Sequence, residues 1–165
     1  MKELPWVIVG LGRVGRALCV LAGRQGIDVR ATWTRADAEP LTALAGELAG
    51  AAVFVTVSDG AIAEVADELA PLCAEAALVV HCSGSISSAV LVDAGITAPV
   101  GSVHPLLAVA DPEEAAARMG SAFWTIEGSE EVAEWAQAWL GRLGVSPARI
   151  EPAHKALYLA AAVTS

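Results

Sequence analysis

The sequence predicts an α/β fold with a doubly wound, mostly parallel sheet and helices on both of its faces. Short apolar runs rich in Val and Ile alternate with longer stretches whose apolar residues recur at helical spacing. Continuous apolar runs are typical of strands buried on both faces of a parallel sheet. Short connections join these elements, and no internal repeat or low-complexity linker interrupts them. This alternation predicts right-handed crossovers within one layered domain.

We expect strands and helices to alternate along the whole chain. The expected strands are 6–9, 29–34, 52–57, 78–80, 99–103 and 122–126. The expected helices are one that begins after residue 15, and 40–49, 62–72, 89–91, 111–119 and 130–143. Trp135 and Trp139 lie four residues apart and therefore on one face of the last helix, so we expect both in the core.

Composition and charge exclude several classes of protein. The chain has 165 residues, of which 55% are hydrophobic and 18% charged, so it is not disordered. Its formal net charge of −9 and its lack of a Lys/Arg cluster disfavour nucleic acid, whose phosphates would be repelled. No apolar run reaches the roughly 18 residues of a membrane span, and no signal peptide precedes the first strand. We expect a cytoplasmic protein that binds no membrane and keeps its three cysteines reduced.

The first expected strand runs into a glycine loop with the pattern G-x-G-x-x-G. Gly10 permits the tight turn, Gly12 lets a pyrophosphate approach the backbone, and Gly15 lets the next helix pack closely on the strand. Backbone N–H groups at the start of that helix would bind the anion. An apolar strand before the loop and a helical pattern after it favour a dinucleotide site over an ordinary turn. The predicted pyrophosphate contacts are Gly10, Leu11, Gly12, Arg13, Val14 and Gly15.

The end of the second strand indicates which dinucleotide binds. In this kind of site an acidic residue about 20 positions beyond the glycines holds the ribose 2′-hydroxyl of NAD, whereas an Arg accommodates the 2′-phosphate of NADP. Thr34 and Arg35 stand at this place, and Asp37 follows only later. They predict NADP(H), although an arginine solvated in a loop is the alternative interpretation.

Small polar residues follow the third and fourth strands. The carboxyl ends of parallel strands line the binding crevice, so Ser58, Asp59, Ser83 and Gly84 are predicted to contact the cofactor. Ser and Asp are also favoured N-caps, and we expect capping of the following helix to be the main role of Ser58 and Asp59. Ser83 or Ser85 would cap the next helix in the same way.

His104 and Pro105 close the fifth expected strand. An imidazole at a strand end can act as an acid or a base near neutral pH, whereas the alternative is a structural histidine bonded to a backbone carbonyl. The sequence positions no base to activate Cys82, which is more simply a small buried residue. His81, His104 and His154 have no carboxylate at ligand spacing, so we expect no metal site.

Four segments and the C-terminal one together resemble a known family. The segments are, in chain order, VIVGLGRVG, VSDGAI, VVHCSGSISS, VGSVHPLLAV and the C-terminal HKALYLAAAVTS. Their order resembles Rossmann-like proteins joined to a helical domain of unknown function 2520. That family is similar to the wider group of pyrroline-5-carboxylate reductase, 6-phosphogluconate dehydrogenase and deazaflavin-dependent NADP reductase. Lys155 and Tyr158 match the family pattern, whereas Leu159 stands where a histidine is common.

The resemblance implies a Rossmann dinucleotide-binding domain over 1–150 and the start of a helical dimerisation and substrate domain over 151–165. The pattern at 156–163 is apolar on nearly every side and needs burial by further protein, so we expect a chain truncated after its first domain. A homodimer is implied for the full-length protein.

The implied activity is an NADP(H)-dependent oxidoreductase that transfers a hydride to or from a small organic substrate. His104, Lys155 and Ser83 are the candidate catalytic residues, Lys155 by analogy with related dehydrogenases. The alternative is a non-catalytic dinucleotide-binding or sensing module that acts through a protein partner. Methyl transfer with S-adenosylmethionine fits the third glycine and Arg35 less well.

Overall fold

A computed structural model describes residues 3–155, 157–158 and 160. The strands are β1 (Trp6–Val9), β2 (Val29–Trp33), β3 (Ala52–Val55), β4 (Leu78–His81), β5 (Val100–Leu106), β6 (Phe123–Gly128) and β7 (Ala148–Arg149). The α-helices are α1 (Arg13–Gln25), α2 (Ile62–Leu69), α3 (Ala89–Asp93), α4 (Pro112–Arg118) and α5 (Glu130–Arg142). The strands form one sheet in the order β2-β1-β3-β4-β5-β6-β7. β2 to β5 run parallel and β6 is antiparallel to β5, which confirms the predicted α/β fold with a mostly parallel sheet.

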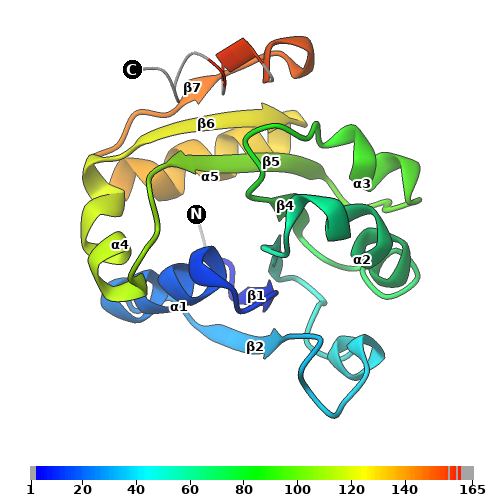
Figure 1. Cartoon of the computed structure of the whole chain (residues 1–165). Helices are drawn as coiled ribbons and strands as arrows, with labels where there is room; N and C mark the ends of the chain where they lie inside the picture. Colours follow the sequence, from blue (N-terminus) through cyan, green and yellow to red (C-terminus); the bar gives the residue numbers. More distant parts are fainter. Residues whose placement is uncertain (1–2, 156, 159, 161–165) are drawn as a thin grey trace.

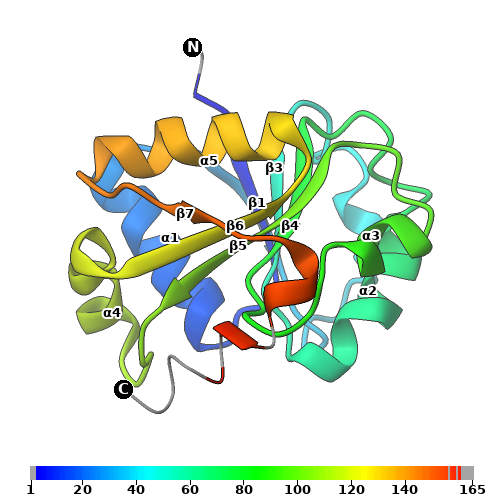
Figure 2. The same ribbon diagram turned by 90° about the horizontal axis from the view of Figure 1, so that it is seen from above.

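Helices cover both faces of the sheet (Figures 1 and 2). α1, α4 and α5 lie on one face, and α2 and α3 lie on the other. Successive residues of β1 point to opposite faces, so that Trp6 and Ile8 join the core under α1 and α5, and Val7 and Val9 join the core under α2. Because both faces are buried, the strands have the continuous apolar sequences that predicted them.

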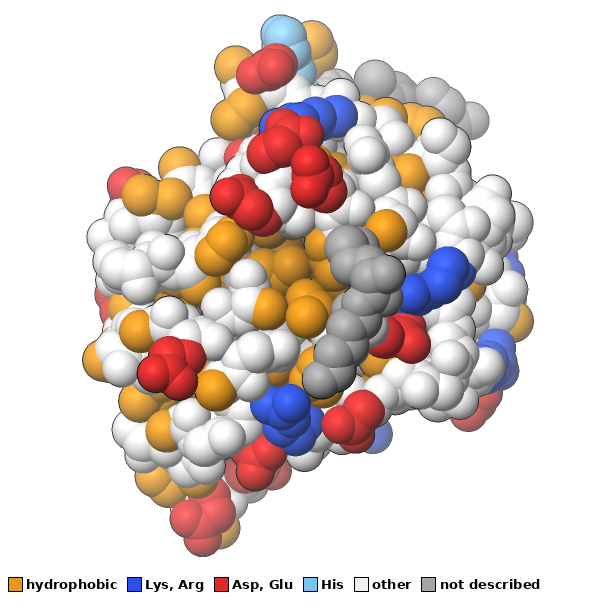
Figure 3. All heavy atoms as spheres, turned by 180° about the vertical axis from the view of Figure 1, so that it is seen from behind, with side chains coloured by type: hydrophobic (Ala, Val, Ile, Leu, Met, Phe, Trp, Pro, Cys, Tyr) orange, Lys and Arg blue, Asp and Glu red, His pale blue; other side chains and the backbone are white. Residues whose placement is uncertain are grey.

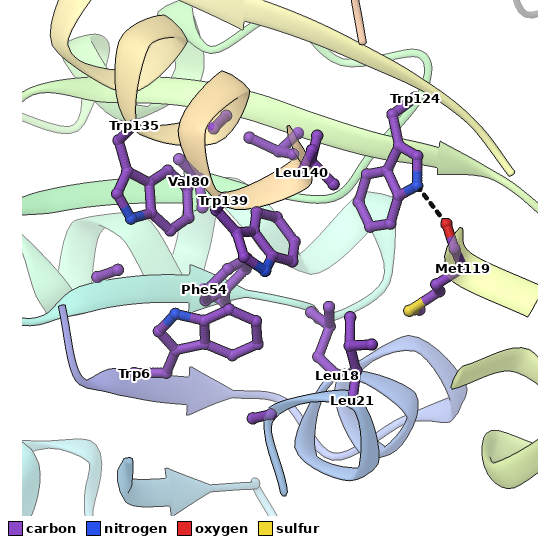
Figure 4. Packing of buried hydrophobic residues seen from close by; sticks show 14 of the residues in the cluster. Trp6, Leu18, Leu21, Phe54, Val80, Met119, Trp124, Trp135, Trp139 and Leu140 are labelled. Atoms are coloured by element: carbon purple, nitrogen blue, oxygen red, sulfur yellow. Dashed lines mark hydrogen bonds between the residues drawn. The ribbon is translucent and has the colours of Figure 1, made fainter. Parts of the chain in front are cut away.

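Aromatic residues fill the core between α5 and the sheet (Figure 4). Trp139 of α5 meets Trp6 of β1 edge-to-face, with ring centroids 5.0 Å apart, and stacks on Trp135 at 5.4 Å. The indole of Trp124 in β6 donates a hydrogen bond to the Met119 carbonyl at 2.9 Å. The predicted burial of Trp135 and Trp139 is confirmed. This packing fixes α5 against the sheet.

The helix predicted over 40–49 is wrong. Only a 3-10 helix, Leu41–Leu44, forms there, and turns follow it. The guanidinium of Arg30 in β2 donates to the carbonyl groups of Glu47 and Ala49 at 3.0 and 2.8 Å. These carbonyls therefore bond to a neighbouring strand instead of to amides of a continuing helix. The apolar side chains of the segment are still buried, which is why a helix was expected.

β5 is longer than predicted. It continues through His104 and Pro105 to Leu106, because the antiparallel β6 pairs with it along that whole length. β4 pairs with β5 only as far as Ser102, so Pro105 faces no β4 neighbour and its missing N–H costs no ladder bond on that side. His104 therefore lies within a strand, and the prediction that it closes the strand is wrong.

The C-terminal part begins with a short strand and a 3-10 helix. β7 was not predicted, and a 3-10 helix, Pro152–His154, leads from it to Lys155. Most of the helix predicted over 156–163 lies outside the described residues, as does Leu159. Leu157, Tyr158 and Ala160 have helical conformation, and the Tyr158 ring lies 6.0 Å from that of Phe123 in β6. Tyr158 thus lies beside the start of β6.

Figure 3 shows the side of the molecule opposite to the one seen in Figure 1. Hydrophobic side chains lie in its centre, and acidic and basic side chains surround them. An ion pair between Glu3 and Arg142 lies on the surface and joins the N-terminal segment to the end of α5. None of the described helices is both long and apolar enough to cross a membrane.

Candidate active site

In the sheet, β2 lies on one side of β1 and β3 lies on the other, so the direction in which the chain adds strands reverses at β1. In an α/β sheet, ligands bind outside the carboxyl ends of the strands at such a switch point. An open cleft of about 470 Å³ lies there. It is lined by residues 10–12 after β1, 34–36 after β2 and 56–58 after β3, together with Arg16 and Ala61. Three loops that are distant in sequence therefore meet where the glycine motif predicted a ligand.

The three glycines of the loop have different structural roles. Gly10 has a φ of +108°, and a Cβ there would lie 2.8 Å from the Val57 nitrogen. A Cβ on Gly15 would lie 2.0 Å from the Gly10 carbonyl oxygen, so any side chain would push α1 off the loop. At Gly12 the nearest atom would be the Thr56 oxygen at 4.0 Å, which leaves the backbone bare and facing the cleft. This open backbone at the start of α1, with no acidic residue in the first helical turn, suits an anionic group.

Other residues of the loop divide into those that line the cleft and those that do not. Leu11 lines it, whereas Arg13 and Val14, predicted as pyrophosphate contacts, are not among the described residues lining it. Arg16 lines it instead, and its Nε donates to the Leu11 carbonyl at 2.9 Å. Thr56 holds the loop through its hydroxyl, which donates to the Gly10 carbonyl at 2.5 Å. Sequence reasoning missed both Arg16 and Thr56.

Thr34 and Arg35 border the cleft as predicted. Thr34 closes a turn, because its N–H donates to the Asp37 carboxylate at 2.7 Å and its hydroxyl accepts from the Ala36 N–H at 3.0 Å. Arg35 forms an ion pair with Glu64 of α2, with an N–O distance of 2.5 Å. Both side chains are more than half exposed, so this ion pair contributes little to stability.

The predicted capping role of Ser58 and Asp59 is wrong. Neither the 3-10 helix Asp59–Ala61 nor α2 has a side-chain cap bond. Ser58 lines the cleft, and the Asp59 carboxylate accepts a hydrogen bond from the Ser85 hydroxyl at 2.7 Å. The loops after β3 and β4 are thereby tied together.

The loop after β4 forms its own turn. The Ser83 hydroxyl accepts from the N–H groups of Ser85 and Ile86 at 3.2 and 3.1 Å, so neither Ser83 nor Ser85 caps α3, and that prediction is wrong. Gly84 lies against the imidazole of His104, because a Cβ there would be 2.7 Å from its Cε1 atom. The structure thus brings Ser83, Gly84 and His104 together as predicted.

A row of polar side chains crosses three neighbouring strands beside this loop. The sheet register pairs His81 of β4 with Ser102 of β5, and Ser102 with Glu127 of β6. Paired residues of neighbouring strands point to the same face. The same row in the other direction leads to Val55 of β3, whose side chain is in the core under α2. The polar row therefore faces the α2 and α3 side, and all three of its residues are buried.

Lys155 inserts its ammonium group into this row. Its Nζ lies 2.5 Å from the Ser102 Oγ, 3.1 Å from the Ser83 carbonyl oxygen and 3.6 Å from the Glu127 carboxylate. Its side chain is 2% exposed and that of Glu127 is 3% exposed. Candidate catalytic residues that are 72 positions apart in the chain are therefore in direct contact.

Burial sets the protonation of the titratable groups around Lys155. Burial lowers the pKa of Lys155 below its ordinary value, and the Glu127 carboxylate opposes this shift. Burial, and to a lesser extent the charge of Lys155, lowers the pKa of His104 to about 4 and the pKa of His81 also to about 4. Burial raises the pKa of the Cys82 thiol to about 12. Near neutral pH both histidines are thus uncharged, whereas burial and the Glu127 carboxylate act in opposite directions on the proton of Lys155.

Glu127 is the main functional candidate that sequence reasoning missed. It is a single acid at the end of an apolar strand, and nothing in its neighbourhood along the chain points to Lys155. The available signal was that His81, Ser102 and Glu127 are polar residues within strands that are mostly apolar. Among the described residues, no group of three or more His, Cys, Asp or Glu side chains is arranged to hold a metal ion.

No protein-family model matches the sequence, and no curated protein matches it. The resemblance to proteins with the domain of unknown function 2520 therefore stays a prediction.

Solved structures do share the fold. A Bacteroides fragilis protein named as an NADP oxidoreductase aligns with a TM-score of 0.78 and 22% identity, over 98% of this chain and 66% of its own. A pyrroline carboxylate reductase from Plasmodium falciparum with NADP bound gives 0.67 and 14%, over 93% and 60%. A variant imine reductase from Myxococcus stipitatus in complex with NAD⁺ gives 0.60 and 21%, over 99% and 60%.

The chain spans 60–66% of the length of these three proteins. At such identities the likeness concerns the fold. The chain has the Rossmann-like α/β fold that these dinucleotide-binding proteins share.

Proposed function

We propose that this chain is the cofactor-binding part of an NADP(H)-dependent oxidoreductase that acts on a small carbonyl or imine compound. The observation that carries the proposal is the bare backbone of Gly12, which faces the cleft at the β1/β3 switch point. The names of the structural neighbours, which include an NADP oxidoreductase and a reductase with NADP bound, support it.

The residues of the cleft fit a dinucleotide. The first-turn N–H groups of α1 and the loop backbone at Gly10, Leu11 and Gly12 would hold the pyrophosphate, and Arg16 would add a positive charge beside it. Arg13, Val14 and Gly15 would support this loop from α1. At the rim, Arg35 would bind the 2′-phosphate of NADP after release from Glu64. Ser58 and Asp59 would contact the adenosine half.

The loop after β4 would hold the reacting end. NADP(H) supplies the hydride when it is bound. Ser83 and Gly84 would position that end beside His104. The His104 imidazole is uncharged near neutral pH, so it would contribute a hydrogen bond and no charge. Lys155 would release one of its present acceptors, give a proton from Nζ to the oxygen or nitrogen that gains charge as the hydride arrives, and regain a proton from water that enters as the product leaves.

The non-catalytic alternative needs only the cleft. A sensing module has no use for an ammonium group that is held among Ser83, Ser102 and Glu127 at the cost of its desolvation. No described feature favours that alternative over an enzyme.

We further propose that residues 1–150 form the dinucleotide-binding domain, that 151–165 begin a helical second domain, and that the whole protein is a cytoplasmic homodimer. Tyr158 against Phe123 supports a second domain that packs beside β6. Light scattering of the protein encoded by the complete gene tests the dimer.

Energy transfer from the protein's tryptophans to the reduced nicotinamide tests the cofactor. We expect NADPH to bind about tenfold more tightly than NADH, which corresponds to about 1.4 kcal/mol from the phosphate contact. Absence of binding by both cofactors, or tighter binding of NADH, would contradict the proposal. Oxidation of NADPH in a panel of small imines and ketones then identifies the substrate class.

A further inference from the structure

The side chain of Glu127 is bound by residues at the start of α3 and also faces Lys155. Its Oε2 accepts the backbone N–H of Ser88 at 2.9 Å, and its Oε1 accepts the Ser88 hydroxyl at 2.6 Å. The Ser87 hydroxyl lies 3.5 Å from Oε1. These hydrogen bonds fix the position of the Glu127 carboxylate beside Lys155.

All the polar atoms nearest to Lys155 Nζ accept hydrogen bonds. The Ser83 carbonyl can only accept, and the Ser102 hydroxyl uses its own proton on that same carbonyl at 3.1 Å, so its oxygen is free to accept from Nζ. An ammonium group can donate to both of these acceptors and still face the Glu127 carboxylate, its ion-pair partner at 3.6 Å. A neutral amine would present a lone pair with no donor facing it. The surroundings therefore fit the protonated form.

Burial disfavours the protonated form of Lys155, and Glu127 is the group that offsets this effect of burial most. Cys82, Asp59, His81 and His104 are the other titratable groups facing Lys155, from the loops after β3 and β4 and from β4 and β5. The two histidines are uncharged near neutral pH and Cys82 stays a thiol. Asp59 is exposed and contributes less than Glu127. The charge that keeps a proton on Lys155 is thus that of Glu127.

We propose that Glu127 is a positioning residue that keeps Lys155 protonated and directs its ammonium group at the Ser83 carbonyl, next to the proposed site of hydride transfer. The role in catalysis rests on the proposed function, whereas the coupling between the two charges does not. Glu127 acts through Lys155 and touches neither cofactor nor substrate.

The chain has two lysines, Lys2 and Lys155, which makes a direct test possible. Lysine labelled with ¹³C and ¹⁵N in a Lys2→Arg background gives one side-chain NMR signal, whose titration reports Lys155 without any cofactor. In Glu127→Gln we expect the pKa of Lys155 to fall by at least about one unit, since a neutral amide no longer offsets burial. Glu134→Gln removes an exposed acid from α5 and should leave the titration unchanged.

An unchanged Lys155 titration in folded Glu127→Gln would overturn the proposal. If that variant does not fold, Lys155→Met combined with Glu127→Gln decides: recovery of folding supports the coupling, and a double variant no more stable than Glu127→Gln contradicts it. In the enzyme assay, the loss of kcat on the alkaline side should move to lower pH by the same shift. If the NMR shift occurs but NADPH does not bind, the charge coupling stands and the proposed function fails.

Discussion

The glycine-loop cleft and the buried lysine network lie at the same end of the sheet but are built in opposite ways. The cleft is open to solvent, and its key contacts are backbone atoms of a continuous segment, 10–15. The network is closed to solvent, and it joins side chains from β4, β5, β6 and the C-terminal segment to backbone groups of Ser83 and Ser88. The bond between Asp59 and Ser85 connects the loops beside them.

The difference indicates how the proposed work is divided. A backbone surface binds phosphate with little dependence on individual side chains, apart from the glycines that leave it bare. A buried ion pair has an exact partner requirement, because removal of one member leaves an uncompensated charge. We therefore expect changes in the cleft to alter affinity, and changes in the network to alter turnover and stability.

The largest effect is expected at Lys155. Lys155→Met should lower kcat roughly a thousandfold, the scale of general acid catalysis, with unchanged affinity for NADPH. It should also destabilise the fold by about 3 kcal/mol, because Glu127 is then buried without its partner. Steady-state kinetics, tryptophan energy transfer and urea unfolding measure these three quantities. Turnover at the original rate would remove Lys155 from the mechanism and leave the cleft assignment intact.

The next effect separates two glycines of the loop. Gly15→Ala should cost about 3 kcal/mol of unfolding free energy, since its Cβ would overlap the Gly10 carbonyl oxygen. Gly12→Ala is the matched control: its Cβ has open space, so the fold should persist while NADPH affinity falls roughly tenfold. Equal stability losses in both variants would show that the loop is not divided as described.

A third effect concerns pH and belongs to the network. The pKa of His81 is about 4 in the folded chain, below its ordinary 6.5, so the unfolded chain binds more protons between these values. The stability from this group is complete above pH 6.5 and is lost as pH falls toward 4, by at most about 3 kcal/mol. His81→Asn keeps an acceptor for the Ser83 N–H and should flatten this part of the profile. Thermal unfolding at half-unit pH steps measures it, and an equally steep profile in the variant would exclude His81 as its source.

The smallest effect is expected at the rim of the cleft. Arg35→Ala should weaken NADPH binding about fivefold and leave NADH binding unchanged, because only NADPH has the 2′-phosphate. Glu64→Gln should tighten NADPH binding about twofold by freeing Arg35 from an exposed ion pair. Glu68→Gln, another exposed acid on α2, is the control. Competition titrations at low salt measure these ratios, and an equal loss of both cofactors in Arg35→Ala would assign the arginine to the shared diphosphate.

The accuracy of the sequence analysis follows the same division. The α/β class, the glycine loop and the buried Trp135 and Trp139 were predictable because each depends on a local pattern or on periodicity. Two of the failures were at 40–49 and at His104. In both, a distant segment decides the backbone: Arg30 takes the carbonyls of the first, and β6 extends the strand that holds the second.

Lys155 shows the limit most clearly. The sequence by itself determined that a lysine follows the last strand and that Ser83 follows the fourth. Only the tertiary structure placed Glu127 and Ser102 in one row with His81 and brought the lysine into that row. The physical reason is that strand periodicity and the conformation of a glycine loop depend on residues that are neighbours in sequence. Burial and the pairing of charges depend on segments that come together only in the folded chain.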